Sequence, residues 1–372
     1  MSEHDFIPTD WELGAIESEK LSGAVSWQSP SNIAIIKYWG KRDQQIPENP
    51  SISFTLTECR TITKLTYQTK AATDDFDFEV YLDGQRQEDF EPKIRTFFQR
   101  TEVYLPFLKH FKFKIETKNT FPHSSGIASS ASGMSALALC LVSLEQVLTK
   151  QLEARHSYKL EYFNQKASFL ARLGSGSACR SIEGPLVVWG RNDSVDNSSD
   201  LVGIKYPYDI HDNFKEFQDT ILLVDKGEKQ VSSTVGHQLM HGHPFAKRRF
   251  EQAHESMGAI KNVLRDGDLD AFIELMESEA LTLHSMMMTS RPYFILMKPN
   301  TLEIINRIWN FRKSSGLHVG FTLDAGANVH VLYPKSEAAQ ILEFIKSELL
   351  SFCQNEQFIV DKAGKGASQI NL

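Results

Sequence analysis

The sequence predicts an α+β protein of two domains. The chain has 372 residues, and a single hydrophobic core rarely grows to that size. Its 41% hydrophobic and 23% charged residues are ordinary for a globular protein. Strand patterns gather before the first long helical pattern instead of alternating with helices. This order favours α+β over a doubly wound parallel sheet.

The first part of the chain carries most of the strand patterns. Apolar or alternating runs predict strands over residues 33–38, 51–56, 61–69, 76–82 and 111–117. The first long helix is predicted to begin at Ser130, where apolar residues start to recur at helical spacing. A second helix is predicted over residues 158–173 and ends at the Gly174-Ser175-Gly176 break.

A polar stretch over residues 192–200 predicts a surface connection and the domain boundary. We therefore predict a lead-in over residues 1–20, a first domain over 21–195 and a second over 196–372. The second domain is predicted to contain strands over 220–225, 318–324 and 328–333 and helices over 244–265, 269–288, 301–314 and 337–350.

Charge and cysteine content narrow the class of protein. The net charge of -7 gives no reason to expect a nucleic-acid partner. The 4 cysteines are too scattered for a zinc site and fit free thiols in a reducing compartment. The acidic N-terminus is unlike a signal peptide, and we see no apolar run long enough to cross a bilayer. We expect a cytoplasmic protein without a membrane partner.

The most informative stretch is the loop from Pro122 to Gly133, which is crowded with Gly, Ala and Ser and runs into the first long helix. Small side chains let backbone N–H groups approach an anion, and the start of a helix favours a phosphate. The hydroxyls of Ser129 and Ser130 are suited to phosphate or a metal ion. An ordinary serine cap on a helix has the same composition, so the loop alone leaves both interpretations open.

Two further segments suit an anionic ligand. Lys37 and Lys41 follow an apolar strand and could hold an anion as point charges, although a solvated strand end is the ordinary alternative. At Gly174 to Ser181, freed backbone and serines precede Arg180, whose planar fork suits a carboxylate or phosphate. A plain helix end with a surface arginine would look the same.

An acidic residue, Asp324, ends an apolar strand and is followed by a turn of small residues. Beside a lysine it would stay ionised, and it could then orient or deprotonate a hydroxyl. Asp also begins turns for reasons of its own backbone, so this segment too is open when taken singly.

Together these segments resemble the diphosphomevalonate decarboxylase branch of the GHMP family of small-molecule kinases. The resemblance extends from Ser31 to about Tyr333. It rests on the runs Asn32–Lys41, Pro122–Ala131, Gly174–Ser181, Val231–Gly236 and Asp324–Asn328. The loop by itself indicates only GHMP kinases in general, and the Lys-Tyr-Trp-Gly-Lys and Gly-Ser-Gly-Ser-Ala-Cys-Arg runs narrow it to this branch.

The resemblance implies the two-domain GHMP-kinase fold, with a ribosomal-protein-like N-terminal α+β domain that binds ATP and an α+β C-terminal domain. It implies that ATP phosphorylates the tertiary 3-hydroxyl of mevalonate 5-diphosphate. Phosphate and CO2 then leave, and isopentenyl diphosphate remains. Mg2+ and a homodimer are also implied.

The resemblance also implies roles for particular residues. The catalytic residues would be Asp324, Lys37 and Arg180. The substrate-binding residues would be Tyr38, Lys41, Ser175, Ser177 and Arg180. The ATP-binding residues would be Pro122, Ser124, Ser125, Gly126, Ala128, Ser129 and Ser130, with Ser130 also at the metal.

Departures from the family pattern concern the substrate. The chain has Met286-Met287-Met288-Thr289 where Cys-Leu-Asp-Thr is frequent, Ala327 where proline is familiar, and His123-Ser124-Ser125 where Thr-Ala-Ala is common. Decarboxylation of mevalonate 5-phosphate, a kinase-only mevalonate 3-kinase and a non-catalytic ATP-binding regulator are the alternatives. Retention of Lys37 and Asp324 favours decarboxylation.

Remaining features are expected to be structural. We predict that the histidines at 237, 241 and 243 are surface residues rather than metal ligands, because Gly242 and Pro244 interrupt the helix. Met286 to Met288 are expected to fill a core. The tail over residues 363–368 is expected to lie in solvent.

Overall fold

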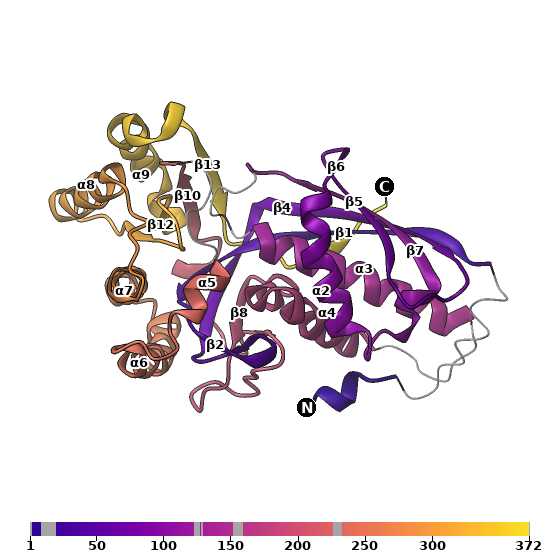
Figure 1. The fold of residues 1–372 in the computed structure, drawn as a ribbon. Coiled ribbons are helices and arrows are strands. Elements are labelled where there is room, and N and C mark those ends of the chain that lie inside the picture. Colours follow the sequence, from indigo (N-terminus) through magenta and orange to yellow (C-terminus); the bar gives the residue numbers. More distant parts are fainter. Residues whose placement is uncertain are drawn as a thin grey trace.

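The computed structural model describes residues 2–8, 20–122, 127, 129–151, 159–225 and 233–371. Within this part of the chain the architecture is two sheets, each with its own helices (Figure 1). The first sheet contains β1 (Ser22–Ile36), β4 (Ser51–Thr69), β5 (Asp77–Leu82), β6 (Gln85–Arg86), β7 (Phe111–Asn119), β8 (Leu186–Trp189), β9 (Ile204–Lys205) and β14 (Ser368–Gln369). A separate short hairpin pairs β2 (Lys41–Arg42) with β3 (Ile46–Pro47).

Two long antiparallel strands, β1 and β4, form the centre of the first sheet. Their register runs from the pair Ser22 and Gln68 to the pair Ile36 and Ile52, with a shift between Pro30 and Asn32. The strands predicted over 51–56 and 61–69 are therefore two parts of one strand, β4. Residues between them, such as Thr57 and Glu58, are polar, which broke the pattern; the strand runs on through them, although its pairing with β1 skips from Thr55 to Arg60.

Helices α3 (Ser129–Gln151) and α4 (Leu160–Gly174) pack beneath the first sheet, with α2 (Glu91–Thr101) beside α4. The expectation that no apolar run could cross a bilayer was wrong for α3. Residues Ser129–Thr149 are long enough to cross a bilayer and have a mean hydropathy of 1.5, but 83% of this window is buried inside the protein. Its apolar composition follows from its place in the core between the sheet and α4.

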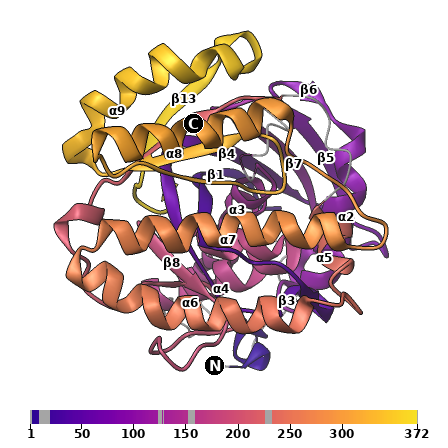
Figure 2. The ribbon, with the colours of Figure 1, turned by 90° about the vertical axis from the view of Figure 1, so that its left-hand side faces the viewer.

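The second sheet is antiparallel and has the order β11-β12-β10-β13. Its strands are β10 (Gln218–Leu222), β11 (Gly320–Thr322), β12 (Val329–Tyr333) and β13 (Phe358–Lys362). Its helices are α5 (Ser233–Gln238), α6 (Ala246–Asp266), α7 (Leu269–Thr289), α8 (Pro299–Ser315) and α9 (Ala338–Phe344). In Figure 2, α6, α7 and α8 run side by side across this end of the molecule. Because α6 and α7 also contact β1, they connect the two halves.

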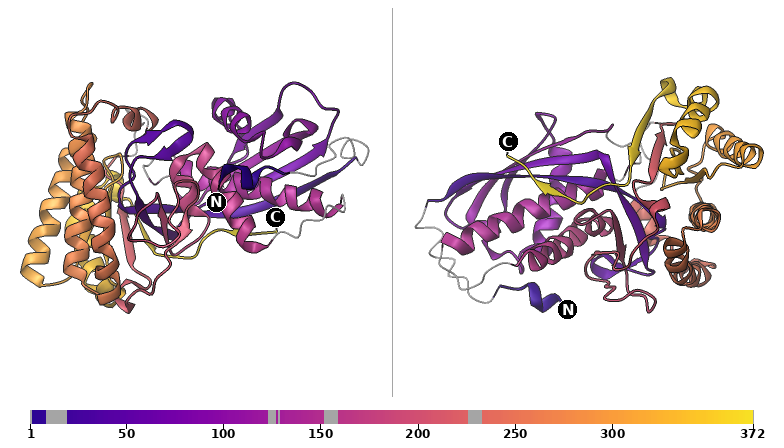
Figure 3. Two further views of the ribbon diagram at one scale, coloured as in Figure 1. Left: turned by 90° about the horizontal axis from the view of Figure 1, so that it is seen from below. Right: turned by 180° about the vertical axis from the view of Figure 1, so that it is seen from behind.

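The C-terminal tail lies on the first sheet, so the prediction of a solvated tail was wrong. The tail leaves β13 and returns to pair with β1 through β14, as the view from behind in Figure 3 shows. Gly364 N–H donates to the Thr55 carbonyl at 2.8 Å, and Ala367 N–H donates to the Ile182 carbonyl at 2.9 Å. Its Gly- and Ser-rich composition allows this close approach to neighbouring backbone.

Strand pairing crosses the predicted domain boundary between residues 195 and 196. β9 follows the boundary in sequence, yet it pairs with β8 in the first sheet. β14 also belongs to that sheet. The boundary after residue 195 therefore does not separate the two sheets. The domain limits of 21–195 and 196–372 stay a prediction.

Candidate active site

A cavity of about 520 Å³ opens beside the end of β1, the start of α3 and the turn after β11. Most of the predicted site residues line it: Lys37, Tyr38, Lys41, Ser129, Ser130, Ser175, Ser177, Arg180 and Asp324. Pro122 is exposed and does not line the cavity. Ser124, Ser125, Gly126 and Ala128 lie outside the described residues.

Lys37 and Asp324 form an ion pair at the centre of the cavity. Lys37 directly follows β1 in the first half of the chain, and Asp324 follows β11 in the second. Lys37 Nζ lies 3.0 Å from Asp324 Oδ1, and the side chains are 2% and 28% exposed. Burial lowers the pKa of the Lys37 ammonium, while the Asp324 carboxylate opposes that shift. The carboxylate thus faces the cavity beside a buried cation, which favours its ionised form.

Arg180 supplies a donor aimed at an anion. It lies in the short 3-10 helix Gly176–Ser181 and is buried against the Trp189 ring, 5.7 Å from its centroid. Its Nη1 donates to Ser51 Oγ at 2.7 Å, but its buried Nε has no hydrogen-bond partner among the described residues. The buried hydroxyl of Tyr38 also lacks a partner there. Unpaired buried donors are costly, so both fit an anionic ligand in the cavity.

The start of α3 faces the same cavity. Ser129, Ser130 and Gly133 line it, and a Cβ added at Gly133 would meet only open space. The free N–H groups and the positive end of the helix dipole favour a phosphate here. The described residues contain no cluster of His, Cys, Asp and Glu suited to a metal. This fits Mg2+, which usually keeps its waters and binds through phosphates with few protein ligands.

The other end of the cavity is apolar, and the sequence analysis missed its residues. They come from β5, β7, α2, α3 and the turn before α2 and include Val80, Leu82, Phe90, Ile94, Ile115, Met134 and Leu137. Thr117 and Asn119 of β7 add polar groups at this end. Each lies on a strand or helix with ordinary periodicity. They are recognisable as site residues only because the fold brings them together at one cavity. Sequence periodicity cannot show which distant segments meet.

A buried network on α6 and α7 holds the main chain of Lys37, and sequence reasoning also missed it. Lys37 N–H donates to Glu279 Oε2 at 2.9 Å, and its carbonyl accepts from Arg249 Nη2 at 3.0 Å and Asn49 Nδ2 at 2.9 Å. Arg249 and Glu279 pair with each other at 2.5 Å and are 0% exposed. The peptide on each side of Lys37 is therefore fixed by charged partners.

Asp324 is held by the same helix. His284 Nε2 lies 3.1 Å from the Asp324 carbonyl oxygen, so the ring nitrogen donates. Burial lowers the pKa of His284 to about 4, so the ring is neutral at pH 7. One helix, α7, thus positions both members of the ion pair.

The histidine prediction was only partly right. His241 is exposed as expected, but His237 and His243 are buried. His237 lines the cavity and His243 does not. The His237 ring packs against Tyr38 and Trp39, which follow β1, and sequence spacing alone does not reveal this contact between distant segments. The His243 ring packs against Phe245, two residues further along.

The methionine segment fills a core, as predicted for two of its members. Met286 and Met287 are buried with Trp39 and Leu283, whereas Met288 is exposed. Met288, where the family pattern has an acid, is exposed and does not line the cavity. The structure therefore gives this departure no direct contact with the predicted site.

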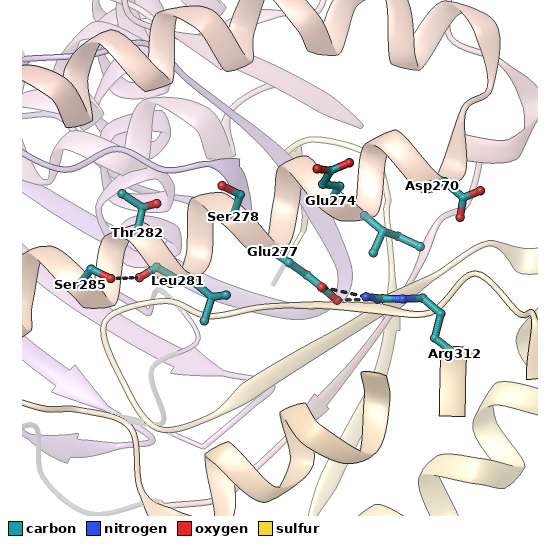
Figure 4. A pocket seen from close by; sticks show the side chains of 9 residues that line it. Asp270, Glu274, Glu277, Ser278, Leu281, Thr282, Ser285 and Arg312 are labelled. Atoms are coloured by element: carbon teal, nitrogen blue, oxygen red, sulfur yellow. Dashed lines mark hydrogen bonds and ion pairs between the residues drawn. The ribbon is translucent and has the colours of Figure 1, made fainter. Parts of the chain in front are cut away.

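A second hollow runs along α7 (Figure 4). Its most ordered feature is the pair of Glu277 and Arg312, whose closest atoms lie 2.7 Å apart. Glu277 also accepts from Trp309 Nε1 at 2.9 Å. None of the predicted site residues lines this hollow, and its single cation, Arg312, is already paired with Glu277, so it does not compete as the reaction site.

Comparison with known proteins gives matches over nearly the whole chain. Residues 29–200 match the diphosphomevalonate decarboxylase-like N-terminal domain, and residues 220–371 match the mevalonate 5-diphosphate decarboxylase C-terminal domain. Diphosphomevalonate decarboxylase mvd1 of Aspergillus fumigatus is 29% identical over 351 residues, which are 90% of this chain and 83% of the relative.

Solved structures agree with the sequence matches. The mevalonate diphosphate decarboxylase of Enterococcus faecalis matches with a TM-score of 0.77 and 26% identity, over 95% of this chain and 100% of that one. A structure described as MDDEF in complex with MVAPP, AMPPCP and magnesium matches with a TM-score of 0.78, 26% identity and the same coverage. These matches confirm the predicted α+β, two-domain GHMP-kinase fold.

Proposed function

The chain belongs to the diphosphomevalonate decarboxylase family, and we propose that it converts mevalonate 5-diphosphate and ATP into isopentenyl diphosphate, ADP, phosphate and CO2. The observation that carries this proposal is the Lys37–Asp324 pair at 3.0 Å in a cavity that also holds Arg180 and the start of α3. The reaction belongs to the mevalonate pathway of isoprenoid biosynthesis.

The first step is phosphorylation of the 3-hydroxyl. Asp324 is the group placed to orient this hydroxyl and accept its proton as the oxygen attacks the γ-phosphorus of ATP. Lys37 keeps the carboxylate ionised until then and offsets charge on the transferred group. The bond to the β-phosphate oxygen breaks, and ADP leaves. Such transfers depend mostly on positioning and on charge neutralisation.

The second step breaks two bonds. The new 3-phosphate leaves with the electrons of the C–O bond, and positive charge develops at C3. The electrons of the bond to the carboxylate carbon then form the double bond, and CO2 is released. Arg180 would hold this carboxylate through its unpaired Nε until the bond breaks.

The remaining residues would bind the two phosphate-bearing ligands. Tyr38, Lys41, Ser175 and Ser177 would hold the substrate diphosphate. Ser129 and Ser130 would hold the ATP phosphates, with Ser130 at Mg2+, and the ion neutralises phosphate charge when bound. The apolar end of the cavity, with Phe90 and Leu82, suits the adenine base.

A substrate comparison tests this function. Purified protein with ATP and Mg2+ is offered mevalonate, its 5-phosphate and its 5-diphosphate, and ADP, phosphate and CO2 are measured separately. We expect CO2, phosphate and ADP in equal amounts from the 5-diphosphate. CO2 from the 5-phosphate alone would identify the monophosphate enzyme. ADP without CO2 would indicate a kinase, and no turnover with any substrate would indicate a non-catalytic relative.

We also propose that the protein is a cytoplasmic homodimer without a nucleic-acid or membrane partner. The dimer rests on the family resemblance, and the compartment rests on cysteines that are free and buried. Light scattering of the purified protein and fractionation of the native cell would check these two statements.

A further inference from the structure

His237 has a hydrogen-bond donor for which the mechanism above has no use. The ring packs against Tyr38, with centroids 4.2 Å apart, and against Trp39, with centroids 4.7 Å apart. Gly40 N–H lies 2.9 Å from His237 Nδ1. A backbone N–H can only donate, so Nδ1 is the acceptor, and in the neutral ring the proton resides on Nε2.

The ring is neutral and its Nε2–H is available. Burial, with smaller effects from Lys41 and Arg180, lowers the pKa of His237 to about 3. His237 lines the cavity, and its Nε2 makes no hydrogen bond with any residue in the described ranges. A donor held at this place by packing against two aromatic rings and by a backbone contact is preorganised for a ligand.

The neighbours of His237 indicate which part of a ligand it meets. It packs at a tilt against Tyr38, whose buried hydroxyl has no partner among the described residues, and its backbone contact is to Gly40, next to Lys41. Asp324 and Lys37 mark the reacting end of the substrate. A neutral donor beside the cations Lys41 and Arg180 adds a hydrogen bond to an anion. It adds no further charge that would repel those two cations.

We propose that His237 Nε2–H binds the 5-diphosphate of the substrate together with Tyr38 and Lys41. This proposal rests on the proposed function, since it names a contact to the same substrate. His237 would then be a substrate-binding residue that acts in the neutral form, and it would contribute to affinity for the diphosphate without contributing to the affinity for ATP.

Two substitutions separate this role from a purely structural one. In His237→Asn, Oδ1 can replace Nδ1 as acceptor for Gly40 N–H, but the Nε2–H donor is lost. In His237→Gln, an amide N–H can take the place of Nε2–H, but the acceptor for Gly40 is lost. A binding role predicts a KM for mevalonate 5-diphosphate raised about 10-fold or more in the Asn variant, because a hydrogen bond to a charged group is lost. The Gln variant should lie closer to wild type, and the KM for ATP should stay within about 2-fold in both.

His243→Asn is the matched control. His243 Nδ1 accepts from Phe245 N–H at 3.1 Å, as His237 Nδ1 accepts from Gly40 N–H, but its Nε2 lies 3.1 Å from the Met286 carbonyl and is used inside the protein. It does not line the cavity, and its substitution should leave the substrate KM unchanged. A structural role for His237 would reverse the order, with the Gln variant worse than the Asn variant. That order, or a wild-type KM in the Asn variant, would overturn the proposal.

A measurement on the wild type decides the matter if either variant fails to fold. Long-range 1H–15N spectra of labelled histidines should show His237 as the Nε2–H tautomer at pH 7, with its Hε2 signal moving downfield when mevalonate 5-diphosphate is added. An unmoved signal at saturating substrate would contradict the contact. Wild-type turnover of the same substrate tests the proposed function separately, because that function can hold while the His237 signal stays unmoved.

Discussion

Replacing Asp324 with Asn is the sharpest test of the active site. The amide keeps the shape and a hydrogen-bond acceptor for Lys37 but cannot take a proton from the 3-hydroxyl. General-base contributions are about 10²–10⁴-fold, so kcat should fall by at least about 100-fold. Since the ATP-binding residues are untouched, the Kd for ATP should change by less than about 3-fold. An Asn variant with kcat within about 10-fold of wild type would refute the assignment of Asp324.

The same substitution should also lower stability, and the geometry bounds the effect. Unit charges 3.0 Å apart at an effective dielectric constant near 20 attract by about 5 kcal/mol. Asp324 is 28% exposed, and Lys37 can lose its proton when its partner is removed. We therefore expect a loss of about 3 kcal/mol in the free energy of unfolding, the lower end for breaking a buried pair.

A double-mutant cycle isolates this coupling. The cycle compares Lys37→Met, Asp324→Asn and the double variant. Tryptophan fluorescence reports their unfolding in urea, and a coupled assay measures their ADP release. The double variant should be more stable than the sum of the single losses predicts, by about 2 kcal/mol. Additive losses would contradict the coupling. The pair of Lys166 and Glu145, 2.5 Å apart and buried, is the control: Lys166→Met should lower stability and leave kcat within about 2-fold.

Three further predictions follow from the structure. Arg180→Lys keeps a charge but loses the planar fork, so kcat/KM for mevalonate 5-diphosphate should fall about 100-fold while the KM for ATP is unchanged, and an unchanged kcat/KM would exclude a carboxylate contact. His237 and His284 have pKa values lowered to about 3 and about 4, whereas in the unfolded chain they titrate near 6.5. Below pH 6.5 the unfolded chain therefore binds protons that the folded chain does not, and each ring lowers stability by about 1.4 kcal/mol per pH unit toward its folded pKa. Urea unfolding at pH 7.5, 6 and 5 should show that the free energy of unfolding falls less steeply with decreasing pH in His284→Gln than in the wild type. An equal fall in both proteins would contradict the burial of a neutral His284. Deleting residues from Gly364 onward removes the backbone bonds to the first sheet and should cost about 3 kcal/mol in urea unfolding, where a solvated tail would cost nothing.

Local patterns account for the part of the fold that the sequence predicted. Helices α3, α4, α6, α7 and α8 were expected close to their observed ranges, because each buries one periodic apolar face. The strand β4 was divided in two because polar residues at its middle interrupt the alternation. Pairing with β1 on both sides of that region makes the two parts one strand, and pairing depends on the neighbouring strand.

Local sequence patterns did not predict which polar residues are buried. His237 and His243 were expected at the surface because histidine is usually exposed, and both are buried by rings and backbone contributed from elsewhere in the chain. The tail from Ala363 was expected in solvent because its Gly and Ser residues form no apolar pattern. Its binding comes from backbone hydrogen bonds, which any residue can make and composition therefore does not report.

By itself the sequence determined the chemistry: a small-residue loop before a helix, lysines and an acid at strand ends, and an arginine in a Gly-Ser turn, in runs that only one family combines. Tertiary structure alone decided that Lys37 and Asp324, 287 residues apart in sequence, meet at 3.0 Å. It also decided that Glu279, Arg249 and His284 hold their backbones. These contacts depend on how α6 and α7 pack across the two sheets, and no periodicity in one segment encodes its distance from another.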